Sequence, residues 1–203
     1  MGKTPIYLDH NATTPVSPTV LDEMLPWLSR AFGNPSSGHF YGKQAKQAVL
    51  EARARVALLI GAQPDEVVFT SGGTESNHLA ILGSVRASAR DRVLVSVVEH
   101  PATMSAAEAA GPVDRADVDG RGSLDLDVLR VTDRHAVVSV MHANNEPGAV
   151  NDLAAVSQRC RAVGATLHSD AAQSAGKIPI DVDAMGVDLL TVVGHKMYGP
   201  KGV

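Results

Sequence analysis

Five short stretches of the chain are rich in β-branched and apolar residues, and each has the length of a buried strand rather than of a helix. These stretches are residues 66–70, 92–98, 136–141, 165–169 and 187–193. Longer segments separate them, and two of those segments repeat apolar residues at helical spacing. The alternation predicts an α/β fold, in which a mostly parallel sheet is covered by helices on both faces.

The two clearest helix patterns both end at a glycine. Residues 42–60 repeat apolar positions every three or four residues and stop at Gly61, and residues 151–163 do the same and stop at Gly164. Glycine readily adopts the left-handed conformation that often follows the last residue of a helix. We therefore predict helices over both segments, each ending immediately before its glycine.

The first fifteen or so residues show no periodic pattern and are predicted to form an irregular arm. A helix is expected to begin at Ser17-Pro18, because proline fits the first helical position. Pro26 should kink or interrupt that helix. We divide the chain into an N-terminal arm, residues 1–16, and one large domain, residues 17–203, with no internal repeat.

The overall composition is that of a soluble globular protein. The chain has 203 residues, of which 44% are hydrophobic, and a formal net charge of −4. This charge gives no support to nucleic-acid binding, and no apolar run is long enough to span a membrane. A single cysteine rules out an internal disulfide, and the N-terminus has no apolar stretch typical of a signal peptide. We expect a cytoplasmic protein.

A possible phosphate site follows the first predicted strand. Gly72-Gly73-Thr74 stands before a predicted helix, and the start of a helix offers free N–H groups to an anion. An ordinary helix cap explains such a turn equally well when it is taken alone. The spacing matches neither a P-loop nor the GxGxxG of a dinucleotide-binding module, so both of those are excluded.

Three further strands are followed by His100, by Asn144-Asn145 and by Asp170. Ligands of parallel sheets bind beyond these strand ends. A histidine there can move protons or stack on a flat ring, and asparagines can bond a ligand oxygen or form a turn. A buried aspartate is costly unless it meets a cation, which could be an arginine, a helix N-terminus or a protonated heterocycle.

The last predicted strand leads to Lys196, which is flanked by Gly194 and Gly199. A lysine at a strand end can form a Schiff base with a cofactor carbonyl, although a solvated loop lysine is the plainer explanation of this stretch alone. A phosphate cradle, a stacking histidine, an anchoring carboxylate, amide donors and an amine are together what pyridoxal phosphate requires. Their joint placement at successive strand ends predicts a site for this cofactor.

With these motifs in this order, the chain resembles the cysteine desulfurase and selenocysteine lyase family, pyridoxal-phosphate enzymes of the aspartate aminotransferase fold type. The motifs that carry the resemblance are residues 7–15, 33–37 and 69–77, Glu99-His100, Asn144-Asn145-Glu146, residues 170–173 and Gly194-His195-Lys196. The resemblance implies a homodimer that takes sulfur from L-cysteine, or selenium from L-selenocysteine, and leaves alanine. It also implies a sulfur acceptor or scaffold protein, as in iron–sulfur cluster assembly, and assigns the arm to the family's small domain.

The resemblance implies roles around the cofactor ring for five residues. Lys196 would hold pyridoxal phosphate as a Schiff base and remove the Cα proton of the substrate. Asp170 would pair with the ring nitrogen, and His100 would stack on the ring and help to move protons. Gln173 would bond the phenolic oxygen, with Asn145 nearby. Lys196 and His100 are therefore the expected catalytic residues, and no metal is expected.

At the phosphate end, the resemblance implies that Gly73, Thr74 and His195 hold the cofactor. Many desulfurases also carry a phosphate-binding hydroxyl three residues before the lysine, a position that is Val193 in this chain. An apolar residue there is similar to the selenocysteine lyase branch. Selenocysteine lyase activity is therefore the alternative to cysteine desulfurase activity.

The resemblance corresponds to the N-terminal half of the family, because the chain stops at Val203. The remaining half normally carries the nucleophilic cysteine and the arginine that binds the substrate carboxylate. Cys160 is not expected to replace that nucleophile, because it shares the apolar stripe of its helix with Leu153 and Val156. We expect residues 1–203 alone to be inactive, and a truncated, non-enzymatic product is the second alternative.

Overall fold

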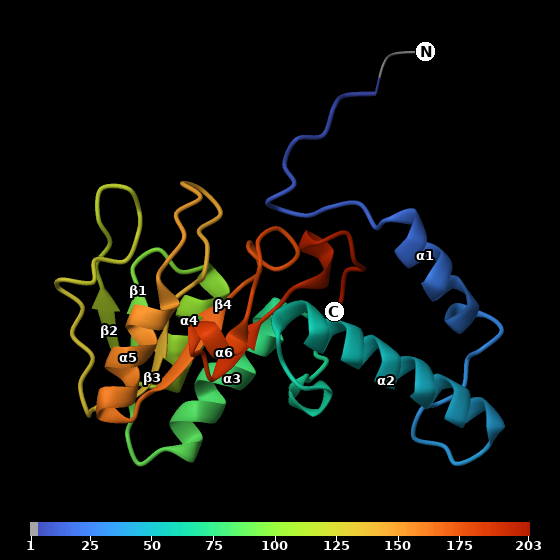
Figure 1. The fold of residues 1–203 in the computed structure, drawn as a ribbon, viewed down its shortest axis with the longest axis horizontal. Helices are drawn as coiled ribbons and strands as arrows, with labels where there is room; N and C mark the ends of the chain where they lie inside the picture. The colour runs from blue at the N-terminus through green and yellow to red at the C-terminus, as the bar shows by residue number, and fades with distance from the viewer. Residues whose placement is uncertain (1–3) are drawn as a thin grey trace.

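The computed structural model describes residues 4–203, and its centre is a five-stranded sheet whose paired strands all run parallel (Figure 1). The order of the strands is β2-β1-β3-β4-β5. They are β1 (Arg92–Ser96), β2 (Val113–Ala116), β3 (His135–Ser139), β4 (Thr166–Asp170) and β5 (Leu189–Thr191). The predicted α/β fold is confirmed, and four of the five predicted strands overlap strands of the sheet.

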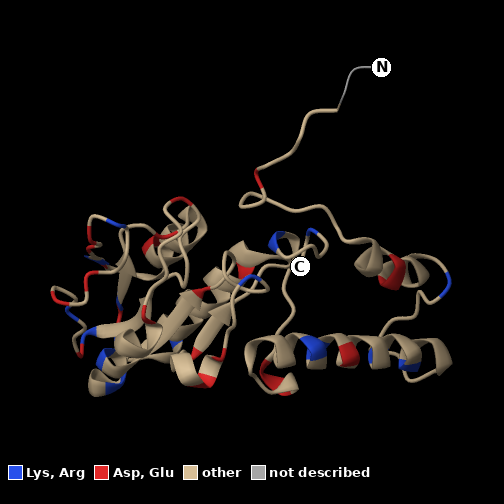
Figure 2. Ribbon diagram, turned by 45° about the horizontal axis from the view of Figure 1, so that its top comes forward, with Lys and Arg blue, Asp and Glu red and all other residues tan. Residues whose placement is uncertain are grey.

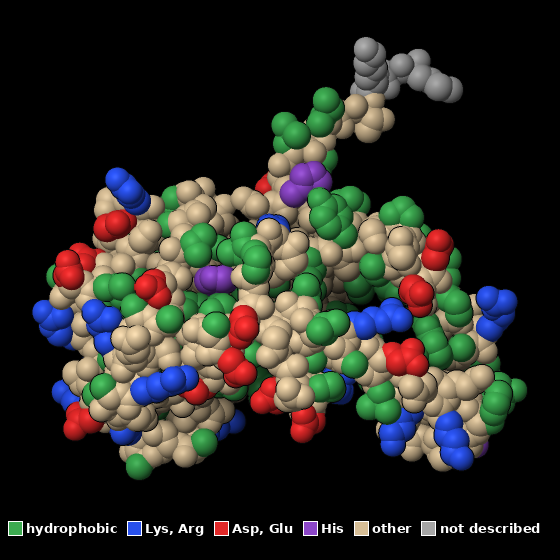
Figure 3. All heavy atoms as spheres, viewed as in Figure 1, with side chains coloured by type: hydrophobic (Ala, Val, Ile, Leu, Met, Phe, Trp, Pro, Cys, Tyr) green, Lys and Arg blue, Asp and Glu red, His purple; other side chains and the backbone are tan. Residues whose placement is uncertain are grey.

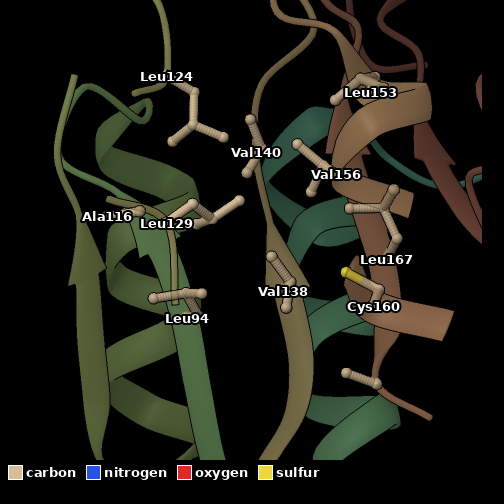
Figure 4. Packing of buried hydrophobic residues seen from close by; sticks show 11 residues of the cluster. Leu94, Ala116, Leu124, Leu129, Val138, Val140, Leu153, Val156, Cys160 and Leu167 are labelled. Atoms are coloured by element: carbon tan, nitrogen blue, oxygen red, sulfur yellow. The ribbon is translucent and has the colours of Figure 1, made fainter. Parts of the chain in front are cut away.

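Helices cover both faces of this sheet. On one face, α3 (Gly73–Ala87) and α4 (Pro101–Ala110) enclose a cluster that includes Ile81 and Val95. On the other face, α5 (Leu153–Val163) packs on β3 and β4, with the short α6 (Val182–Met185) beside it. Figure 4 shows this second cluster, in which Cys160 faces the apolar side chains of the strands. The predicted end of α5 is confirmed, since Gly164 has a φ of 67°.

The N-terminal part of the chain lies to one side of the sheet (Figure 1). It contains α1 (Pro18–Met24), the 3₁₀ helix η1 (Leu25–Leu28) and the long α2 (Phe40–Ile60). The hydroxyl of Ser17 caps α1, and Pro26 lies in η1, so the predicted start and interruption are both confirmed. The predicted end of α2 is also confirmed, because Gly61 is left-handed with a φ of 73°.

This N-terminal part buries few apolar side chains. None of the residues of α1 or η1 is buried, and Phe32 and Phe40 are largely exposed. Figure 3 shows apolar side chains at the surface there. Figure 2 shows acidic and basic residues interspersed around the sheet, whereas α2 carries several basic residues along its length. No helix in residues 4–203 is both long and apolar enough to cross a membrane.

The strand predicted at residues 66–70 is wrong. Pro64–Glu66 form the 3₁₀ helix η2, and residues 67–70 belong to no strand. β-branched residues favour an extended backbone, but a strand also needs a neighbouring backbone with which to exchange hydrogen bonds. Within residues 4–203 this segment pairs with no strand, and Val68 and Phe69 instead line a cavity of about 320 Å³ together with Leu189 and Leu190 of β5.

The strand β2 was not predicted from the sequence. Its four residues include Asp114 and Arg115, so it has no apolar run to reveal it. It is an edge strand, and Asp114 forms an ion pair with Arg92 of β1 and a hydrogen bond with His135 of β3. The proposed division into an arm, residues 1–16, and a domain, residues 17–203, stays a prediction, and residues 1–3 lie outside the described residues.

Candidate active site

One cavity of about 610 Å³ brings together all eight residues proposed from the sequence to bind a cofactor. It lies where α3 begins and where the segments after β1, β3, β4 and β5 leave the sheet. Parallel strands deliver the residues that follow them to the same edge, which explains the convergence. The eight residues that line it are Gly73, Thr74, His100, Asn145, Asp170, Gln173, His195 and Lys196.

Asp170 is the last residue of β4, and it is only 6% exposed. Its Oδ1 accepts a hydrogen bond from the backbone N–H of Ala172 at 2.9 Å, and its Oδ2 accepts one from Nδ2 of Asn77 at 2.9 Å. No lysine or arginine in residues 4–203 forms an ion pair with it. A buried carboxylate held only by neutral donors can still bind a cation on the ligand side.

His100 follows β1 and caps the start of α4. Its Nδ1 accepts a hydrogen bond from the backbone N–H of Ala102 at 3.1 Å, and Pro101 occupies the first position of the helix. Because Nδ1 is the acceptor, the neutral ring carries its proton on Nε2. The cap thereby restrains the ring at the wall of the cavity, with one nitrogen able to donate a proton.

Lys196 ends the 3₁₀ helix η3 (Gly194–Lys196), just beyond β5. Within residues 4–203 its amine makes no hydrogen bond to a side chain or backbone group and no ion pair. Burial and then the charge of Lys196 lower the pKa of the neighbouring Lys177. The amine of Lys196 is therefore available to react at the cavity wall.

Residues of the N-terminal arm also reach the cavity, a role that the sequence did not reveal. Nε2 of Gln173 donates to the carbonyl of Asn11 at 2.9 Å, and Oε1 of Gln173 accepts from Nζ of Lys177 at 3.0 Å. The side chain of Asn11 donates in turn to the carbonyl of Asn145 at 3.0 Å. Asn11 thus lies between two proposed cofactor residues, and its place in the motif at residues 7–15 was the only signal for it.

The two neighbouring asparagines after β3 have different surroundings. Asn144 is buried, and its Nδ2 donates to the carbonyl of Val98 at 3.1 Å while its Oδ1 accepts from the backbone of Glu146. Its amide is therefore used within the turn and in joining the turn to the segment after β1. Asn145 lines the cavity instead, and its role beside the cofactor stays a prediction.

The start of α3 also lines the cavity, and Gly73 and Thr74 are its first helical residues. The first N–H groups of a helix have no partner inside it and favour an anion. A Cβ on Gly73 would lie 2.8 Å from Cγ2 of Val193, so these two residues pack closely. Val193 is 6% exposed, and it offers no hydroxyl to a ligand at this end.

His195 connects this end of the cavity to the arm. Its Nδ1 lies 3.0 Å from Oγ1 of Thr13. Burial is the main cause that lowers the pKa of His195, and the charges of Lys196 and Lys201 lower it further. A neutral imidazole at neutral pH is therefore expected until an anion arrives, since negative charge would favour its protonated form.

Glu99 and Asn77 are buried polar residues near the cavity to which the sequence did not assign a role. Burial raises the pKa of Glu99 to about 8, and the charge of Asp170 adds to this, against hydrogen bonds from Ser96 and Met141 that lower it. Each has one buried polar atom without a partner in residues 4–203, Oε2 of Glu99 and Oδ1 of Asn77. Both residues stand inside motifs of the resemblance, which was the available signal.

Cys160 does not reach the cavity. Its side chain is 1% exposed in the apolar cluster below α5 (Figure 4). Burial, with a contribution from the charge of Asp188, raises the pKa of its thiol to about 12. Since the thiolate is the reactive form, this thiol is inert at neutral pH. The expectation of a buried cysteine in the helix is confirmed.

The chain is similar to cysteine desulfurases in sequence. It is 45% identical to the cysteine desulfurase IscS of Rickettsia africae over 98% of this chain and 51% of that protein. It is 46% identical to the cysteine desulfurase IscS of Neisseria meningitidis over 99% of this chain and 52% of that protein. The chain thus spans about half the length of the curated relatives it matches.

Solved structures agree with this similarity. A structure described as a NifS-like protein matches with a TM-score of 0.92 and 32% identity, covering 98% of this chain and 57% of that one. A structure described as SspA in complex with cysteine matches with a TM-score of 0.89 and 35% identity, covering 97% of this chain and 59% of that one. The family model described as Aminotransferase class-V matches residues 6–203. With its parallel sheet, its cavity and these likenesses, the chain belongs to the aminotransferase class-V family.

Proposed function

We propose that this chain binds pyridoxal 5'-phosphate and provides most of the cofactor site of a cysteine desulfurase. The observation that carries the proposal is the meeting of Lys196, Asp170 and His100 with the start of α3 in one cavity. The relatives named as cysteine desulfurases support L-cysteine as the substrate. Alanine and sulfur are the proposed products.

The chemistry of the donor set fits the cofactor. The free N–H groups of Gly73 and Thr74, with His195, suit a phosphate. The buried carboxylate of Asp170, which lacks an ion pair in residues 4–203, suits a protonated ring nitrogen, and the amine of Lys196 suits the aldehyde. When bound, pyridoxal phosphate supplies an electron sink for negative charge that develops at Cα of the substrate.

Four side chains of the cavity would have separate roles in the reaction. The amine of Lys196 would take the proton from Cα of cysteine. The carboxylate of Asp170 would keep a proton on the ring nitrogen by its negative charge. His100 would lie against the ring and could donate from Nε2, because Nδ1 already accepts from Ala102. Gln173 would orient the ring through its phenolic oxygen.

The sulfur must leave to a nucleophile other than Cys160, whose thiol is buried and whose pKa is raised to about 12. A persulfide-forming cysteine outside residues 4–203 is therefore part of the proposal, as are a sulfur-acceptor or scaffold protein and a role in iron–sulfur cluster assembly. A homodimer and a cytoplasmic location complete it. Residues 1–203 by themselves are proposed to be inactive in sulfur release.

The decisive experiment measures the visible absorption of the purified protein with pyridoxal phosphate, before and after borohydride. The unaltered protein should show a band that borohydride abolishes, and Lys196→Ala should lack it. Lys177→Ala is the matched control, since this neighbouring lysine should not be needed for the band. A band that survives Lys196→Ala, or that requires Lys177 instead, would refute the assignment. Release of alanine from L-cysteine by residues 1–203 would refute their inactivity.

Selenocysteine lyase activity is the second candidate, and one observation favours it. Val193 is buried against Gly73, where many desulfurases carry a hydroxyl. The two activities are separated by comparing alanine release from L-cysteine and from L-selenocysteine in the complete protein. Release from L-selenocysteine alone would support the lyase, whereas release from both would support the desulfurase.

A further inference from the structure

Asn77 is a buried side chain of α3 that the proposed chemistry does not use. It is 1% exposed and lies at the cavity. Its Nδ2 donates to Oδ2 of Asp170 at 2.9 Å and to Oγ1 of Thr103 at 3.0 Å. Its Oδ1 is buried without a partner in residues 4–203. An unpaired buried polar atom costs free energy. The hydrogen bonds that Nδ2 donates must therefore offset the cost of burying Oδ1.

The carboxylate of Asp170 determines which way the amide of Asn77 points. Ionised carboxylate oxygens only accept hydrogen bonds, so Nδ2 and not Oδ1 must face them. The other donor to this carboxylate is the backbone N–H of Ala172. Within residues 4–203, Asn77 is therefore the one side chain that donates to Asp170, and donors to a charged group make the stronger hydrogen bonds.

Asn77 also connects three of the elements near the cavity. Its own helix, α3, begins with Gly73 at the proposed phosphate end. Thr103, its second partner, belongs to α4, which His100 caps. Asp170 ends β4. One amide of α3 thus contacts the first turn of α4 and the end of β4.

We propose that Asn77 is a positioning residue that holds the carboxylate of Asp170 where it meets the ring nitrogen of pyridoxal phosphate. The inference rests on the proposed function and adds a residue to it. Asn77 acts on the ring nitrogen only through Asp170. Its effect should therefore appear with a ligand that carries this nitrogen and disappear with a ligand that lacks it.

The test compares the affinity for pyridoxal phosphate with that for an analogue in which a C–H group replaces the ring nitrogen. The full chain is expected to prefer pyridoxal phosphate. Asn77→Leu keeps a similar volume and removes the donor, and it should reduce this preference about tenfold, the factor that corresponds to one lost hydrogen bond to a charged group. Fluorescence titration measures both dissociation constants.

Thr103→Val is the matched control. It removes the other hydrogen bond of Asn77 and leaves the bond to Asp170, so it should change the preference by less than about twofold. A merely structural role for Asn77 predicts that both variants lose stability and that neither changes the preference. Both ligands bind the same folded fraction, so partial unfolding of a variant cancels in the ratio.

The outcomes distinguish the two proposals. If Asn77→Leu does not fold, Asn77→Ala replaces it, since it also removes the donor and should reduce the preference by a similar factor. An unchanged preference in the folded variant, or an equal loss in Thr103→Val, would overturn the positioning role. If the unaltered protein binds neither ligand, the proposed function itself fails and the positioning role fails with it.

Discussion

The hydroxyl of Thr14 accepts a hydrogen bond from the backbone N–H of Tyr198 at 2.8 Å, across 184 residues of sequence. The same hydroxyl donates to the carbonyl of His195 at 2.9 Å, so it bridges the residues that flank Lys196. Tyr198 has a φ of 62°, a left-handed conformation that costs a non-glycine residue roughly 1–2 kcal/mol. The N-terminal arm thus helps to hold the strained loop that carries the lysine.

Thr14→Val is expected to lower the free energy of unfolding by about 1–3 kcal/mol, because it leaves the N–H of Tyr198 without its partner. Urea unfolding measures this as a lower midpoint with an unchanged slope. Thr14→Ser keeps the hydroxyl and should recover most of the loss. Equal midpoints for the valine and serine variants would show that the hydroxyl does not stabilise the loop.

Gly73→Ala is expected to distort the start of α3, because the new methyl group would lie 2.8 Å from Cγ2 of the buried Val193. Overpacking of this kind costs about 1–3 kcal/mol. It should also weaken the binding of pyridoxal phosphate, since the N–H groups at the helix start would move.

Val193→Ala supplies the control for this close contact. The double variant, with alanine at both positions, should lose less unfolding free energy than the two single variants lose together. The reason is that the smaller side chain at position 193 makes room for the methyl group at position 73. Unfolding free energies of the four proteins give the coupling. Strict additivity would mean that the contact between these residues is not the reason for glycine at position 73.

Glu99 should make the protein less stable as the pH rises. Its pKa is raised in the folded protein from its ordinary value of 4.5 to about 8, with burial as the main cause. The unfolded chain therefore loses this proton at lower pH than the folded protein does. The destabilisation begins near pH 4.5, grows up to about pH 8 and then levels off. Each unit of difference between the folded and unfolded pKa lowers the free energy of unfolding by about 1.4 kcal/mol.

Glu99→Gln tests this pH dependence, because glutamine keeps an acceptor for Ser96 and Met141 and does not ionise. The variant should gain stability relative to the unaltered protein as the pH rises between these limits. Urea unfolding across this range measures the difference. Glu108→Gln, at an exposed position of α4, is the control and should show no such trend. Parallel pH profiles for Glu99→Gln and the unaltered protein would contradict the prediction.

Cys160 should resist thiol reagents in the folded protein, because its thiol is buried and its pKa is raised to about 12. Labelling should become fast only in denaturant, which a colorimetric thiol reagent can follow. Cys160→Ser should cost about 1–3 kcal/mol of stability, since a hydroxyl would enter the apolar cluster. It should leave the binding of pyridoxal phosphate unchanged. Rapid labelling without denaturant would contradict the burial of this thiol.

Local patterns were enough to predict much of the fold. Gly61 and Gly164 end their helices as expected, because the left-handed cap depends on a single residue and its neighbours. The strand predicted at residues 66–70 was wrong, because an apolar β-branched run favours an extended backbone but does not specify a partner strand. β2 was missed for the opposite reason. Asp114 and Arg115 interrupt any apolar pattern, and the segment is a strand because it pairs with β1.

The sequence by itself determined which chemical groups stand at the ends of the strands, and through the motifs it indicated a family. The tertiary structure alone decided how those groups are held. Asn77 meets Asp170 across 93 residues, and Asn11 meets Gln173 across 162. Hydrogen bonds between residues so far apart in the sequence depend on how helices and strands pack. Periodicity and spacing along the chain do not predict that packing. The groups of the site were thus readable from the sequence, whereas the contacts that orient them existed only in the fold.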